Sequence, residues 1–249
     1  MKIVGVIPAR YGSTRFPGKP LKLLKGKPIL EWVIDLTKKS KLLSDVIVAT
    51  DHQEIFDLGR NLGAKCEMTT QDCATGTDRI FQALQKRSQA GENYDYVINI
   101  QGDEPLLPVS YIDQLAQSFL DNSKLDMVTL SHPLDPRDID NMSAVKVLIN
   151  QYNEAIYFSR FPIPYSRERL CSALQNLNYP VQKHIGLYGF KSSFLKDFCN
   201  FPQAEIEKNE SLEQLRALYM GAKIKVISVE QPTYGIDTPE DLERLEHKL

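Results

Sequence analysis

The sequence lacks the features of a secreted or membrane-spanning protein. The apolar run at residues 3–7 is too short for the hydrophobic core of a signal peptide, and no later run approaches the length of a membrane span. Cysteine is scarce, and the cysteines have neither the close paired spacing of a zinc site nor the density of a disulfide framework. These absences predict a cytoplasmic protein with reduced thiols and no membrane partner.

The sequence also lacks an excess of either charge. It has 30 Lys and Arg residues against 32 Asp and Glu residues, which gives a formal net charge of -2. This balance produces no overall field that would draw the protein to nucleic acid or to an anionic membrane. We therefore expect no nucleic-acid partner, and any anion site must come from a local cluster of cations.

The first half of the chain alternates between short β-branched runs and segments of helical periodicity. Strand-like runs at residues 3–7 and 46–50 alternate with helical segments at 29–40 and 53–62, and the alternation reaches a further strand at 96–100. Repeated strand–helix–strand units build parallel sheets with helices on both faces. This pattern predicts an α/β fold with a doubly wound, mostly parallel, Rossmann-like sheet.

The rhythm changes in the second half. Three strand-like runs between residues 127 and 159 follow one another through short turns, which is typical of antiparallel strands. Residues 160–180 contain three prolines and several charges, and they predict a long loop. The length of 249 residues, 42% of them hydrophobic, suits one compact unit. We predict a single domain over residues 1–249 with a small antiparallel lobe inserted at about 127–190.

The C-terminal region predicts two more helices around a strand at 224–229. Helical periodicity covers 211–220, where Leu212, Leu215 and Tyr219 are expected to form the buried stripe. A final helix begins at Thr238, whose hydroxyl suits an N-cap and is followed by proline. We expect that helix to run to Leu249 and to pack on the sheet.

A basic loop follows the first strand, at the edge where open α/β sheets bind ligands. It carries Arg10, Arg15 and Lys19, which can meet several phosphate oxygens at once, and Gly12 and Gly18, which let backbone amides approach a ligand. Its spacing matches neither the dinucleotide fingerprint GxGxxG nor the P-loop GxxxxGK[ST]. The loop therefore predicts a polyphosphate site and argues against NAD enzymes and P-loop kinases.

Two aspartates are candidate magnesium ligands. Asp103 directly follows the apolar strand 96–100, so it should emerge at the same sheet edge as the basic loop. Mg²⁺ takes one or two carboxylates besides water and phosphate oxygens, so one further acid suffices. Asp237, just before the final helix, is our candidate, although a helix-entry residue that satisfies backbone amides is the alternative interpretation.

A turn of small residues, Thr75-Gly76-Thr77, leads into a helix beginning near Asp78. Its free amides and hydroxyls could bond a base edge or a ribose, while an ordinary N-cap at Thr77 is the alternative. The turn by itself does not distinguish cytosine from uracil.

Several of these segments together resemble the 3-deoxy-manno-octulosonate (Kdo) cytidylyltransferases, or CMP-Kdo synthetases. The likeness spans nearly the whole chain and rests on segments at residues 8–21, 48–51, 75–79, 99–105, 157–160, 184–188, 212–216 and 235–241. The resemblance implies a nucleotide-diphospho-sugar transferase-like fold, a homodimer, Mg²⁺ as cofactor, and CTP and Kdo as substrates. It also implies a role in activating the sugar for lipopolysaccharide assembly, and a role for the inserted lobe in sugar binding or dimerisation.

The resemblance further implies roles for individual residues. The catalytic set is Arg10, Lys19, Asp103 and Asp237, with Asp103 and Asp237 as metal ligands. The implied CTP-binding set is Ala9, Arg10, Gly12, Ser13, Arg15, Lys19, Thr75, Gly76, Thr77 and Asp103. The implied sugar-binding set, which must clamp an acidic sugar, is Gln101, Arg160, Arg167, His184, Tyr188, Glu213 and Gln214.

Other functions remain open at this point. A cytidylyltransferase for a related acidic sugar, such as 8-amino-Kdo or a sialic acid, would use a similar site. The run Pro17-Gly18-Lys19-Pro20-Leu21 looks more like the Kdo enzymes than the sialic-acid enzymes. A noncatalytic CTP-binding module is a different class, and the presence of both Asp103 and Asp237 argues against it.

Overall fold

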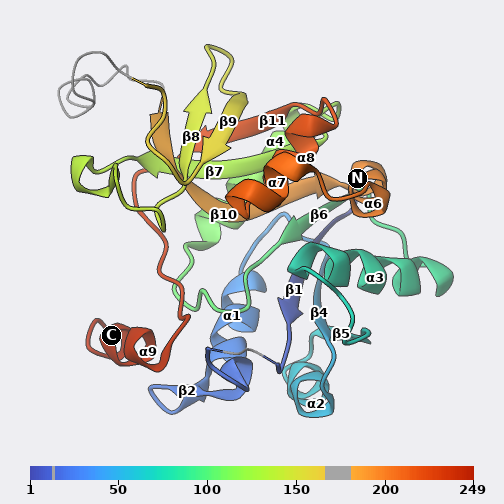
Figure 1. Cartoon of the computed structure of the whole chain (residues 1–249). Helices are drawn as coiled ribbons and strands as arrows, with labels where there is room; N and C mark the ends of the chain where they lie inside the picture. The colour runs from blue at the N-terminus through green and yellow to red at the C-terminus, as the bar shows by residue number, and fades with distance from the viewer. Residues whose placement is uncertain (13–14, 166–180) are drawn as a thin grey trace.

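The computed structural model describes residues 1–12, 15–165 and 181–249, and a nine-stranded mixed sheet runs through them. Seven strands follow the order β11-β7-β10-β6-β1-β4-β5, and β8 and β9 branch from β10 (Figure 1). The strands are β1 Ile3–Ala9, β4 Asp45–Thr50, β5 Lys65–Met68, β6 Tyr96–Asn99, β7 Met127–Pro133, β8 Lys146–Ile149, β9 Ala155–Ser159, β10 Val181–Lys191 and β11 Ile224–Ser228.

The N-terminal half is the predicted doubly wound unit. β6, β1, β4 and β5 are parallel neighbours, and the crossovers between them carry α1 Ile29–Thr37, α2 Gln53–Asn61 and α3 Gly76–Gln89. Successive residues of β1 enter different cores, because Ile3 and Ile7 pack with α1 and α4 (Val109–Asp121) while Val4 and Val6 pack on the α3 side. Burial on both faces explains the continuous apolar run of β1, and the α/β prediction is confirmed.

β10 is one of the elements that the sequence analysis did not predict, together with α7 (Glu205–Glu210) and the hairpin of β2 (Leu23–Leu24) and β3 (Lys27–Pro28). It lies between β6 and β7, antiparallel to both, and its first residues also pair with β8. β7 runs parallel to β11, so β7 and most of β10 belong to the central sheet, whereas β8 and β9 extend it as an antiparallel hairpin. The assignment of 127–190 as an inserted lobe stays a prediction.

Helices after β10 cover the α3 side of the sheet. They are α6 Ser192–Asn200, α7 Glu205–Glu210 and α8 Gln214–Tyr219. The helix predicted over 211–220 is shorter, because Ser211 adopts a left-handed conformation (φ 51°) that ends α7. The predicted buried stripe is also wrong at one position, since Tyr219 is exposed.

The final helix, α9 (Pro239–Glu246), does not pack on the sheet as predicted. Leu245 instead joins a small core with Phe16, Leu24, Ile29 and Ile236, beside a hairpin of β2 (Leu23–Leu24) and β3 (Lys27–Pro28). Leu249 is exposed and lies beyond the helix, because α9 ends before it. Short 3-10 turns span Lys19–Leu21 and Pro136–Asp138.

A connecting strap, residues 229–238, joins β11 to α9. It leaves the upper part of the molecule and descends along one side to α9 (Figure 1). The strap is fastened to the body, because the Tyr111 hydroxyl bonds the carbonyl and the amide of Gln231 and the Ile236 amide donates to the Asp103 carbonyl (2.9 Å). No helix within the described ranges is both long and apolar enough to cross a membrane.

Candidate active site

A cavity of about 320 Å³ opens at the carboxyl ends of β1 and β6. Parallel strands present their carboxyl ends at the same edge of a sheet, so the loops after β1 and β6 meet there with the N-terminus of α3 and the end of the strap. The lining residues are Pro8, Ala9, Arg10, Arg15, Lys19, Pro20, Cys73, Ala74, Thr75, Gly76, Arg79, Gln101, Gly102, Asp103 and Asp237.

The basic loop wraps one side of this cavity. The Gly18 amide donates to the Tyr11 carbonyl (3.0 Å) and closes the loop, and Gly18 has a φ of 66° that favours glycine. A Cβ at Gly18 would also come within 3.3 Å of the Tyr11 ring. Gly12 is exposed, and Ser13, a predicted CTP ligand, lies outside the described residues.

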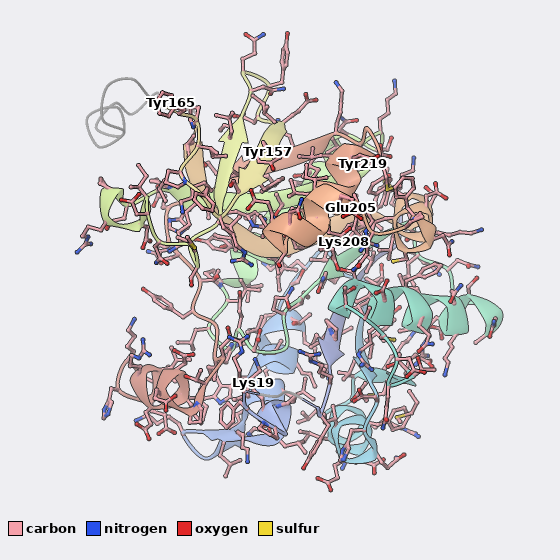
Figure 2. All side chains as sticks on the ribbon, in the orientation of Figure 1. Lys19, Tyr157, Tyr165, Glu205, Lys208 and Tyr219 are labelled. Carbon is pink, nitrogen blue, oxygen red and sulfur yellow. The ribbon has the colours of Figure 1, made fainter. Side chains whose placement is uncertain are left out.

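The two predicted metal ligands converge on one lysine. The Lys19 Nζ lies 2.5 Å from Asp103 Oδ2 and 3.5 Å from Asp237 Oδ1, although these residues are 84 and 218 positions away in the chain. Arg15 adds a second contact to Asp237 at 3.2 Å. Figure 2 shows Lys19 between α9 and β1, in the lower half of the molecule. The structure therefore brings the basic loop and both aspartates together.

The donor set fits magnesium. The Lys19 ammonium between the carboxylates shows that this place attracts a cation, and both aspartates keep part of their surface open to the cavity. The described residues contain no group of three His, Cys, Asp or Glu side chains that could hold a metal. A metal held by Asp103 and Asp237 would complete its coordination shell with water and phosphate oxygens, which is the usual coordination of Mg²⁺.

A buried ion pair, which the sequence analysis did not assign to the site, supports the basic loop. Asp51 accepts the Tyr11 amide (3.1 Å) with one oxygen and receives Arg79 Nη2 (2.9 Å) with the other. The side chains of Arg79 and Asp51 are only 4% and 11% exposed, so water screens the pair little. His52 stacks on the Tyr11 ring with the centroids 3.9 Å apart. The position of Asp51 after strand 46–50, at the ligand edge, was the signal available in the sequence.

Glu104, next to Asp103, contacts the strap. Its Oε1 accepts from the Thr233 hydroxyl (3.3 Å), and its Oε2 is buried. Burial, reinforced by the negative charge of Asp103, raises the pKa of Glu104 to about 7. Glu104 therefore joins the Asp103 loop to the segment that delivers Asp237.

The turn before α3 caps this helix with a different residue from the predicted Thr77. Thr75, not Thr77, is the N-cap: its hydroxyl accepts the Asp78 amide, and the Asp78 carboxylate accepts the Thr75 amide, both at 3.1 Å. Thr75 and Gly76 line the cavity, as the CTP prediction requires. Thr77 lies one residue inside the helix and is 2% exposed.

Four predicted sugar residues gather beyond Gln101, on β10 and at the start of α8. Gln101 Nε2 donates to the Gly186 carbonyl (3.1 Å), which ties the cavity edge to β10. His184 packs between the rings of Phe158 and Tyr188, and burial lowers its pKa to about 3, so its ring is neutral. Burial raises the pKa of Glu213, and Gln214 is buried with Nε2 lacking a partner in the described part of the chain.

The two predicted sugar-binding arginines stand apart from this group. The Arg160 guanidinium donates to three backbone carbonyls, those of Glu210 (2.9 Å), Met142 (3.1 Å) and Ser211 (3.3 Å). Its visible role is therefore to fasten loops together, and its sugar role stays a prediction. Arg167 lies outside the described residues.

Comparisons with known proteins decide the family. A family model described as cytidylyltransferase matches residues 4–224. A 3-deoxy-manno-octulosonate cytidylyltransferase of Bdellovibrio bacteriovorus is 55% identical over 249 residues, covering 100% of this chain and 98% of its own. The chain belongs to the 3-deoxy-manno-octulosonate cytidylyltransferase family. The family's enzyme from Thermodesulfovibrio yellowstonii is 46% identical, again over 100% of this chain and 98% of that relative.

Solved structures agree with membership of the cytidylyltransferase family. A CMP:2-keto-3-deoxy-manno-octonic acid synthetase complexed with CTP has a TM-score of 0.91 and 36% identity, and the match covers 100% of this chain and 98% of that one. A 4-diphosphocytidyl-2C-methyl-D-erythritol synthase from Anaerococcus prevotii has a TM-score of 0.64 at 13% identity, with 99% and 96% coverage, and so shares the fold alone.

Proposed function

We propose that this cytidylyltransferase transfers CMP from CTP to the anomeric hydroxyl of Kdo and releases pyrophosphate. The observation that carries the proposal is the meeting of Asp103, Asp237 and the cationic loop around Lys19. The chain in which they meet is 55% identical to a 3-deoxy-manno-octulosonate cytidylyltransferase. The solved relative at 36% identity was complexed with CTP, which supports the choice of nucleotide.

The reaction is an in-line displacement at phosphorus. The anomeric oxygen forms a bond to the α-phosphorus of CTP, the bond from that phosphorus to the bridging oxygen breaks, and the hydroxyl proton leaves to water. Arg10, Arg15 and Lys19, which line the cavity, would neutralise the charge of the departing pyrophosphate. Catalysis then comes from positioning and charge neutralisation, without a covalent enzyme intermediate.

Asp103 and Asp237 would hold Mg²⁺ in this scheme. When bound, Mg²⁺ supplies Lewis-acid charge neutralisation at phosphate oxygens. The aspartates would set where that charge lies, and the backbone hydrogen bond from Ile236 to Asp103 holds the end of the strap beside the Asp103 loop. Lys19, at the same place, would contribute its positive charge to the phosphates.

The biological setting forms a further part of the proposal. A cytoplasmic enzyme suits the free thiols of Cys66, Cys73 and Cys199, since the cytosol keeps thiols reduced. Activated Kdo would serve lipopolysaccharide assembly. A homodimer is supported by large hydrophobic side chains exposed in and after the β8–β9 hairpin: Tyr152, Ile156, Phe161 and Tyr165.

A matrix of four nucleoside triphosphates against several acidic sugars, scored by pyrophosphate release with Mg²⁺, tests the proposal. CTP with Kdo should give the highest turnover, because the small turn at Thr75 and Gly76 suits a pyrimidine edge. Preferred use of 8-amino-Kdo or a sialic acid would change the sugar. CTP binding without any turnover would indicate a noncatalytic module.

A further inference from the structure

Thr77 faces away from the nucleotide cavity. It immediately follows Gly76, which lines the cavity, yet Thr77 is 2% exposed and is absent from the cavity wall. Its hydroxyl forms a hydrogen bond to Glu213 Oε1, across 136 positions of sequence. Because its hydroxyl bonds Glu213 and its side chain is buried away from the cavity, Thr77 is not placed to contact a base or a ribose.

The direction of this hydrogen bond follows from the chemistry of the two groups. A threonine hydroxyl has one proton, and an ionised carboxylate can only accept, so Thr77 donates to Glu213. Glu213 is partly buried and stands at the N-cap of α8, next to the buried Gln214. A carboxylate in such a place needs donors to hold one orientation, and Thr77 supplies one.

The position of Glu213 connects it to the sugar side of the site. Tyr188 is near enough for the charge of Glu213 to act on its hydroxyl, and His184 packs beside Tyr188 with the ring centroids 5.4 Å apart. Sugar hydroxyls are donors, and a carboxylate held in a fixed orientation is a suitable acceptor for them. The nucleotide turn and this acceptor are thus joined by side-chain hydrogen bonds to Glu213, from Thr77 and also from Thr75.

We propose that Thr77 is a positioning residue for the sugar, which orients the Glu213 carboxylate, and that it is not a ligand of CTP. This inference rests on the proposed function, because Kdo is the substrate whose hydroxyls Glu213 would accept. It replaces the nucleotide role that the sequence resemblance implied for Thr77. Gly76 keeps its place in the nucleotide site.

The test uses Thr77→Val, which keeps the shape of threonine and removes the hydroxyl. We expect the KM for Kdo to rise on the order of tenfold, as for one lost hydrogen bond to a charged group. The KM for CTP, and the affinity for CTP alone measured by calorimetry, should stay within about twofold. Thr77→Ser should restore the KM for Kdo. Thr37→Val is the matched control, since Thr37 is also a buried helical threonine but bonds the Val33 carbonyl.

A double-mutant cycle shows whether Thr77 acts through Glu213. The double variant Thr77→Val/Glu213→Gln should have nearly the same KM for Kdo as the single variant Glu213→Gln, because the group that Thr77 orients has already been altered. Additive effects, or weaker CTP binding by Thr77→Val in calorimetry, would overturn the inference. Wild-type pyrophosphate release with CTP and Kdo checks the proposed function separately, so failure of one is distinguishable from failure of the other.

Discussion

At the scale of single residues, the charge of Asp103 is the clearest target. Asp103→Asn keeps the shape of the side chain but removes the charge that faces Lys19. We expect kcat to fall on the order of a hundredfold or more, the scale seen when one preorganised electrostatic partner is lost. The fold should be intact by circular dichroism. Turnover near the wild-type value at saturating Mg²⁺ would remove Asp103 from the catalytic set.

The buried pair of Asp51 and Arg79 makes a stability prediction. Arg79→Met leaves the Asp51 carboxylate buried without its cation, which should lower the free energy of unfolding by about 3–5 kcal/mol in urea titrations. Lys208→Met is the matched control, because Lys208 and Glu205, labelled in Figure 2, form an exposed pair on α7. That variant should change stability by less than about 1 kcal/mol. Equal effects in the two variants would contradict the prediction.

His184 predicts a pH dependence of stability. Its folded pKa, about 3, lies below the ordinary histidine value of about 6.5, because burial disfavours the charged ring. A lowered folded pKa contributes stability that is complete above the unfolded pKa and is lost as the pH falls towards the folded one. Between pH 7 and 4, the Tm of wild type should therefore fall more steeply than that of His184→Gln. Parallel slopes would show that the ring protonates freely in the folded state.

Some of the residue positions at the site could be predicted from the sequence, and others could not. Arg10, Arg15, Lys19 and Asp103 could be placed at the cavity from sequence, because the basic loop follows β1, Asp103 follows β6, and these parallel strands end at the same edge of the sheet. The sequence analysis put the possible N-cap at Thr77, although the capping-box spacing of Thr75 and Asp78 was a signal for the cap that the structure has at Thr75. The inward turn of Thr77 could not be predicted, because its partner Glu213 comes from an element distant in sequence.

At the scale of elements, α9 separates two roles for neighbouring acids. The Asp241 carboxylate accepts the amides of Asp237 and Thr238 (3.1 and 3.0 Å), while the Asp237 side chain contacts Arg15 and Lys19. Asp241→Ala should therefore cost about 1 kcal/mol, or roughly 2–4 °C in Tm. Asp237→Asn should melt within about a degree or two of wild type and lose about a hundredfold in kcat. The reverse pattern in melts and Mg²⁺ titrations would make Asp237 a helix-entry residue.

The failure to predict β10 from the sequence has a physical explanation. A bulge between Ile185 and Tyr188 breaks the alternation of β10, so its burial pattern has no simple period of two. Gly189 lies beside β7 and against α4. A Cβ at this position would lie 2.7 Å from Val128 of β7 and from Phe119 of α4, so no larger residue fits without a shift of these side chains. The parallel strands were predictable because both of their faces are buried, which leaves long apolar runs.

At the scale of the whole molecule, the hydrophobic side chains exposed in and after the β8–β9 hairpin predict a homodimer. Ile156 on β9 is 52% exposed, and Tyr165, labelled in Figure 2, is 91% exposed. We expect wild type to behave as a dimer in light scattering and Ile156→Glu to shift it towards monomer. Leu23→Glu is the control, since Leu23 is 56% exposed on the separate β2–β3 hairpin. A wild-type monomer, or equal behaviour of both variants, would contradict the prediction.

The strap has a consequence for the order in which the protein is made. Translation proceeds from Asp103 to Asp237, and the helices and strands from α4 to β11 must leave the ribosome before the second carboxylate exists. A ribosome that stalls anywhere in that interval releases a chain with the cationic loop and one acid only. Such a chain lacks Asp237, one of the two carboxylates that face Lys19. If Asp237 is a metal ligand as proposed, we expect every chain that ends before it to lack turnover of CTP.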